Sequence, residues 1–101
     1  MDLIEAHRTE LAELCRRYHV RRLDVFGSAA RVTDFDPARS DIDLLVNYLP
    51  GHGPAFREYL ELRDGLEALL DRTVDLVMEG AVENPFIRAD IERFRQPIYA
   101  A

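Results

Sequence analysis

The chain has 101 residues, of which 48% are hydrophobic and 32% are charged, and its net charge is −6. This composition excludes an unfolded polar chain, and the length predicts a single domain over residues 1–101. No apolar run reaches the roughly 20 residues of a membrane helix. The negative charge argues against a general nucleic-acid binder, although a bound divalent cation can still hold a nucleotide at an acidic site.

The first five residues lack the basic and apolar regions of a secretory signal peptide. Cys15 is the only cysteine in the sequence, so no disulfide framework is expected. Both observations favour a cytoplasmic protein.

The first half of the chain predicts a helix, a strand and a polar loop. Apolar side chains recur at three- and four-residue steps over residues 2–18, which is typical of one amphipathic helix. Residues 21–26 alternate in polarity and predict a strand. A glycine and a serine then end the strand, residues 29–31 favour a helical turn, and residues 33–40 are predicted to form a loop.

The second half alternates strands and helices. Its predicted elements are a strand over residues 41–48, a helix over 54–70, a strand over 72–78, a helix over 84–95 and a short extended tail at 98–99. The helix over 54–70 has a predicted apolar stripe of Phe56, Leu60, Leu62, Leu66, Leu69 and Leu70. Together, the elements predict a small α/β (α+β) domain with a short mixed sheet of three or four strands flanked by helices.

Two acids, Asp41 and Asp43, stand at the start of an otherwise apolar strand. Residues i and i+2 of a strand project from the same face, roughly 6.6 Å apart. If the strand over 72–78 pairs beside this one, at about 4.8 Å, Asp75 reaches the same volume. Three carboxylates there would repel one another, and one or two Mg²⁺ ions would remove that conflict. The alternative is that Asp41 begins the strand in solvent and Asp43 pairs with an arginine.

A candidate phosphate site follows the first strand. Gly27 permits a close approach of backbone N–H groups to a ligand, and Ser28 opens a helical turn whose free N–H groups favour an anion. Arg31 and Arg39 lie in the same region and could contact phosphate oxygens. The alternatives are an ordinary N-cap at Ser28 and solvated or acid-paired arginines.

Three segments together point to a family: residues 25–31 (Val-Phe-Gly-Ser-Ala-Ala-Arg), 40–46 (Ser-Asp-Ile-Asp-Leu-Leu-Val) and 74–77 (Val-Asp-Leu-Val). The chain resembles the minimal nucleotidyltransferases of the DNA polymerase β superfamily over nearly its whole length. The resemblance implies transfer of AMP from ATP to an acceptor hydroxyl, with release of pyrophosphate. It also implies an antitoxin whose partner is a helical HEPN ribonuclease toxin, neutralised by AMP addition to a tyrosine, by binding, or by both.

Residue roles follow from the resemblance by position. Asp41 and Asp43 would hold the metals that bind the triphosphate, and Asp75 would complete the metal site beside the acceptor hydroxyl. Gly27 and Ser28 would hold the phosphates. Three hypotheses remain open from the sequence: a Mg²⁺-dependent nucleotidyltransferase, a module of the same fold that neutralises its partner by contact alone, and a structural α/β domain with an acidic surface cluster. A homo- or hetero-oligomer is compatible with each of the three.

Overall fold

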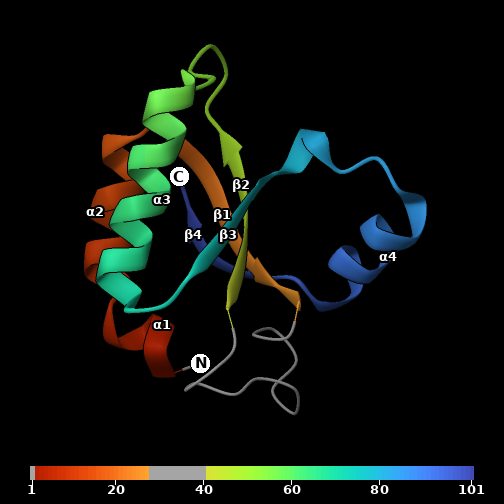
Figure 1. Cartoon of the computed structure of the whole chain (residues 1–101), viewed down its shortest axis with the longest axis horizontal. Helices are drawn as coiled ribbons and strands as arrows, with labels where there is room; N and C mark the ends of the chain where they lie inside the picture. Colours follow the sequence, from red (N-terminus) through yellow and green to blue (C-terminus); the bar gives the residue numbers. More distant parts are fainter. Residues whose placement is uncertain (1, 28–40) are drawn as a thin grey trace.

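The computed structural model describes residues 2–27 and 41–101 (Figure 1). Its elements, in chain order, are α1 (Asp2–Ala6), α2 (Arg8–Arg17), β1 (Val20–Phe26), β2 (Ile42–Tyr48), α3 (Phe56–Leu70), β3 (Val74–Met78), the 3₁₀ turn η2 (Glu79–Ala81), α4 (Pro85–Phe94) and β4 (Gln96–Ala100). None of the helices in these ranges is long and apolar enough to cross a membrane.

The four strands form one mixed sheet in the order β3-β2-β1-β4. β1 pairs antiparallel with β2 and with β4, whereas β2 and β3 run parallel. The predicted mixed sheet is therefore confirmed. The segment expected to be only an extended tail is the edge strand β4, because its backbone completes hydrogen bonding along β1.

The predicted single N-terminal helix is wrong in one respect: it is two helices that meet at His7. The backbone of His7 leaves the helical region at φ −119° and ψ 18° and caps α2, where its carbonyl accepts a hydrogen bond from the Leu11 amide at 2.8 Å. Ile4 of α1 and Leu11 of α2 both remain buried in the same core. The apolar spacing therefore identified the buried side chains correctly but could not reveal the break between them.

One face of the sheet is covered by α1, α2 and α3, and the core lies between these helices and the strands (Figure 1). Alternate strand residues such as Leu23, Val25 and Leu44 point into this core. Gly65 lets α3 approach α2 closely, since a Cβ there would lie 3.1 Å from the Leu14 methyl groups. The predicted stripe of α3 is wrong at Phe56, the first residue of the helix, whose side chain is 75% exposed.

The opposite face of the sheet carries the strand residues that alternate with those pointing into the core. Here Leu45 is buried, and it lines a small cavity together with Ile91 and Arg95 from the α4–β4 segment. α4 lies on this side of the sheet, away from the three N-terminal helices (Figure 1). Asn84 begins α4 as predicted, because its side-chain oxygen accepts from the amides of Phe86 and Ile87. The predicted acids Asp43 and Asp75 also lie on this second face.

Candidate active site

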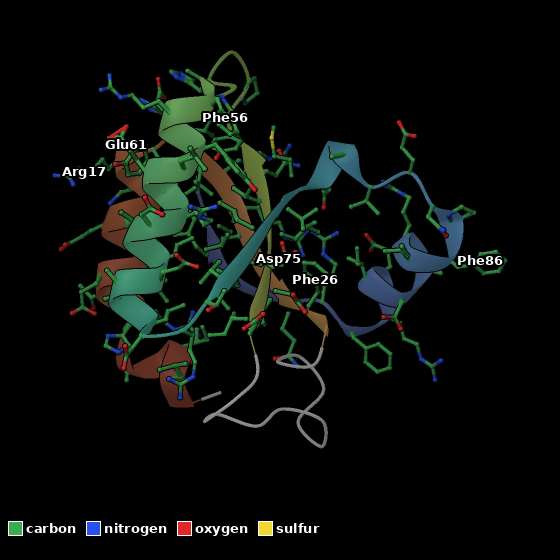
Figure 2. All side chains as sticks on the ribbon, viewed as in Figure 1. Arg17, Phe26, Phe56, Glu61, Asp75 and Phe86 are labelled. Carbon is green, nitrogen blue, oxygen red and sulfur yellow. The ribbon has the colours of Figure 1, made fainter. Side chains whose placement is uncertain are left out.

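Two of the predicted acids are direct cross-strand neighbours. Asp43 of β2 and Asp75 of β3 occupy the same register position of the parallel pair, with Ile42 opposite Val74 and Leu44 opposite Leu76 on either side. Neighbours in register project from the same face of a sheet. That face is the one opposite the core helices, because Ile42 and Leu44 are fully buried on the other. Figure 2 shows Asp75 on the side of the sheet away from α2. The pairing assumed in the sequence argument is therefore present.

Asp41 lies immediately before β2 and is exposed, whereas Asp43 is half-buried. Burial raises the pKa of the Asp43 carboxyl above its usual value, and repulsion from Asp75 and then Asp41 raises it further. Within residues 2–27 and 41–101, no arginine forms an ion pair with any of the three acids. The alternative in which an arginine neutralises Asp43 therefore finds no support in this part of the chain.

Gly27 directly follows β1 and lies against the acid of the neighbouring strand. Its φ is +66°, a value that favours glycine, and a Cβ at this position would overlap Oδ2 of Asp43 and come within 3.1 Å of its Cγ. Phe26, the residue before it, pairs in register with Asp43. The end of β1 at Gly27 therefore lies beside the carboxylate of Asp43, as the predicted phosphate site requires. The other predicted phosphate contacts, Ser28, Arg31 and Arg39, lie outside the described residues.

A model of a protein family described as the nucleotidyltransferase domain matches residues 8–98. The chain belongs to the nucleotidyltransferase domain family. This match spans the acid pair, Gly27, the strands β1, β2 and β3 and the first part of β4, and it confirms the class of protein that the three sequence segments indicated.

Known nucleotidyltransferases extend the comparison. The protein adenylyltransferase MntA of Thermococcus cleftensis is 38% identical over 83 residues, which cover 82% of this chain and 77% of that protein. A solved structure provisionally described as a minimal nucleotidyltransferase is 35% identical, with a TM-score of 0.75 and 96% of both chains covered. A complex of tri-AMPylated HEPN toxin from Shewanella oneidensis with MNT antitoxin contains a chain of the same fold, at 18% identity, a TM-score of 0.67 and coverage of 97% and 73%.

By their chemistry, the three predicted acids fit a magnesium ion. Carboxylate oxygens are the ligands that Mg²⁺ prefers, and a divalent cation would offset the repulsion that raises the pKa of Asp43. As the described side chains stand, no three of the acidic, histidine or cysteine groups are gathered closely enough to chelate an ion. The register brings the strand positions together, and binding an ion would also require the carboxylates to turn toward one another.

A second polar cluster, which was not predicted from the sequence, lies on the same sheet face. Asp24 is fully buried and forms ion pairs with Arg22 and Arg95, and Arg95 also pairs with Glu79 and Glu92. The available signal was an acid between Leu23 and Val25 in an apolar strand, the same pattern that singled out Asp43. Its partner could not be found, because Arg95 is 71 residues away.

Proposed function

We propose that this nucleotidyltransferase is a Mg²⁺-dependent protein adenylyltransferase that acts as an antitoxin. It transfers AMP from ATP to a tyrosine hydroxyl of a partner HEPN toxin, in the cytoplasm, as a single domain over residues 1–101. The observation that carries the proposal is the register pair Asp43–Asp75 beside Gly27. The name of the Thermococcus cleftensis relative and the AMP-modified toxin in the Shewanella oneidensis complex support it.

In this proposal Asp41 and Asp43 hold one or two Mg²⁺ ions, with Asp75 completing the set. The ions would neutralise charge on the triphosphate and on the developing transition state. The backbone of Gly27 and the hydroxyl of Ser28 bind phosphate oxygens, and Arg31 and Arg39 provide further phosphate contacts.

The transfer step forms one bond and breaks one bond. The acceptor hydroxyl oxygen bonds to the α-phosphorus of ATP, and the bond from that phosphorus to the oxygen bridging to the β-phosphate breaks. Pyrophosphate leaves with the bonding electron pair. The hydroxyl proton passes to the carboxylate of Asp75, which is exposed at the edge strand β3 and so accessible to an acceptor from outside.

The experiment is labelling of the co-expressed HEPN partner with ATP radiolabelled at the α-phosphate. We expect label on a partner tyrosine, located by mass spectrometry, and no label with the γ-phosphate isotope or after chelation of Mg²⁺. The double variant Asp41→Asn with Asp43→Asn should abolish the label. Asp64→Asn, which alters an exposed acid on α3, is the matched control. Label that persists in the double variant would remove these acids from the mechanism.

A second candidate is an antitoxin that neutralises its partner by contact alone. The observation in its favour is the exposed apolar pair on α4, where Phe86 is 84% and Ile87 is 52% exposed. This candidate expects the double acid variant to co-purify with the toxin and to protect cells fully. If the folded variant still binds the toxin but no longer protects, contact alone is excluded.

A further inference from the structure

The helix α4 makes few apolar contacts with the rest of the domain. Within Pro85–Phe94, Ile91 is the buried residue, and Phe94 packs partly against the core. The side chains from residue 83 to residue 90 are all exposed. Apolar packing alone therefore gives α4 a weak hold on the sheet.

Arg95, the residue that follows α4, supplies a stronger attachment. Its Nε donates to Oδ2 of Asp24 at 2.5 Å, its Nη2 pairs with Oε1 of Glu79 at 2.6 Å, and its Nη1 donates to Oε1 of Glu92 at 2.7 Å. Only 11% of the Arg95 side chain is exposed, and Asp24 is fully buried. Because the guanidinium is planar with five donors on three nitrogens, it holds each of the three carboxylates through a different nitrogen, whereas the three donors of a lysine share a single nitrogen.

Two further hydrogen bonds fix the carboxylates that Arg95 contacts. Arg22 donates to the second oxygen of Asp24 at 2.9 Å, and Asn47 donates to the second oxygen of Glu79 at 2.8 Å. Burial raises the pKa of Glu79, but the hydrogen bonds from Arg95 and Asn47 outweigh it, and the net shift is downward. The cluster of Arg22, Asp24, Asn47, Glu79, Glu92 and Arg95, here called the Arg95 cluster, therefore ties β1, β2, η2 and α4 together through hydrogen bonds and ion pairs.

The Arg95 cluster lies next to Asp43 and Asp75 along the strand direction, on the same face of the sheet. Asp24 pairs in register with Leu45, and the next same-face pair along these strands is Phe26 with Asp43. On β3, Val77 follows Asp75 on this face and is partly exposed. Figure 2 shows Asp75 and Phe26 on the side of the sheet toward α4. A nucleoside that extends from the acids along β3 would meet Val77 first. It would then meet the Arg95 cluster, which contacts α4.

We infer that Arg95 is a positioning residue: it holds α4 over the acid-bearing face and thereby sets the space that receives the nucleoside of the substrate. This inference rests on the proposed function for its nucleotide part. The hold on α4 is independent of that function and can be measured without any substrate.

The test compares Arg95→Met and Arg95→Lys with Arg93→Met as the matched control. Arg93 is an exposed arginine on α4 that lies over the Phe94 ring and outside the cluster. In Arg95→Met, amide hydrogens of residues 85–94 should exchange at least about 10-fold faster, while those of α2 change less than about 2-fold. The affinity for Mg²⁺-ATP, measured by calorimetry, should fall by at least about 5-fold, with a higher KM and a smaller change in kcat. Arg95→Lys should be intermediate, and Arg93→Met should match the unchanged protein.

Arg95→Met leaves Asp24 buried with one cation fewer, and this variant is the one most at risk of failing to fold. The double variant Asp24→Asn with Arg95→Gln removes the buried charges and retains amide hydrogen bonding. It should reproduce the fast exchange in α4 and the weaker Mg²⁺-ATP binding.

Unchanged exchange in α4 in a folded Arg95 variant would overturn the inference. An equal loss of Mg²⁺-ATP affinity in Arg93→Met would also overturn it. If the unchanged protein binds no Mg²⁺-ATP, the proposed function fails and the nucleotide part of the inference fails with it. The exchange data would then still decide whether Arg95 holds α4.

Discussion

Gly27 lies against the carboxylate of Asp43, with a φ of +66° and no room for a Cβ beside Oδ2. This contact joins the end of β1 to the acid on β2. The absence of a side chain at position 27 is what permits this close approach of the backbone to Asp43. In the proposed function, the same approach brings the substrate phosphates next to the acids that would hold their metal ions.

Gly27→Ala should therefore impair both folding and catalysis. The positive φ and the overlap with Asp43 should lower the free energy of unfolding by about 1–3 kcal/mol, measured by urea denaturation. The shifted carboxylate should lower the rate of partner labelling by about 100-fold. Gly51→Ala is the control, because Gly51 has a φ of +79° and open space around it. A loss of labelling as large in Gly51→Ala would mean that backbone strain, not the contact with Asp43, causes the effect.

Asp43→Asn should stabilise the metal-free protein at neutral pH. The pKa of Asp43 is raised in the folded state, so folding favours its protonated form. Asp43 therefore stabilises the fold fully only at pH values below the pKa that its carboxyl has in the unfolded chain, about 3.9. This stabilisation is lost as the pH rises through the higher pKa of the folded state. Because Asp43 is partly solvated, we expect a gain of no more than about 1 kcal/mol at pH 7.

Thermal unfolding at several pH values measures this effect. The advantage of Asp43→Asn should shrink as pH falls toward 4 and should shrink at pH 7 when Mg²⁺ is added, since the ion stabilises only the unchanged site. Asp64→Asn, on the exposed surface of α3, should show neither trend. A stability loss in Asp43→Asn at pH 7 without Mg²⁺ would contradict the repulsion among the three acids.

Cys15 should be inert in the native protein. Its side chain is fully buried on α2, and burial raises the pKa of its thiol to about 12. Since the thiolate is the reactive form, a disulfide reagent at pH 8 should modify Cys15 at least about 100-fold more slowly in the native state than in urea. Absorbance of the released thiol measures both rates. Rapid stoichiometric modification of the folded protein would show that the core around α2 opens readily.

Leu66→Ala and Phe56→Ala should differ strongly, although both residues belong to the same predicted stripe. Leu66 is fully buried, so its truncation should cost about 2–5 kcal/mol of unfolding free energy. Phe56 is 75% exposed, and its truncation should change the stability by no more than about 0.5 kcal/mol. Urea denaturation of the two variants provides the comparison. A large loss in Phe56→Ala would mean that this ring is covered in solution.

Local pattern accounts for much of the fold. Strand alternation identified β1, β2 and β3, and apolar spacing identified the buried side chains of α2 and α3, although it also included the exposed Phe56. These features depend on neighbours within a few residues. The break at His7 and the strand β4 were not predicted, because the first leaves the apolar spacing intact and the second depends on pairing with β1 about 75 residues earlier.

The amino-acid sequence by itself determined the acids, the glycine and the family, because a carboxylate in an apolar strand and a positive-φ turn each require particular residue types. Only the tertiary structure decided that Asp43 and Asp75 stand in register, and that Arg95 meets the buried Asp24. Both relationships join residues more than 30 positions apart. Strand register and ion pairing across such distances depend on how the whole chain packs, and no local pattern encodes them.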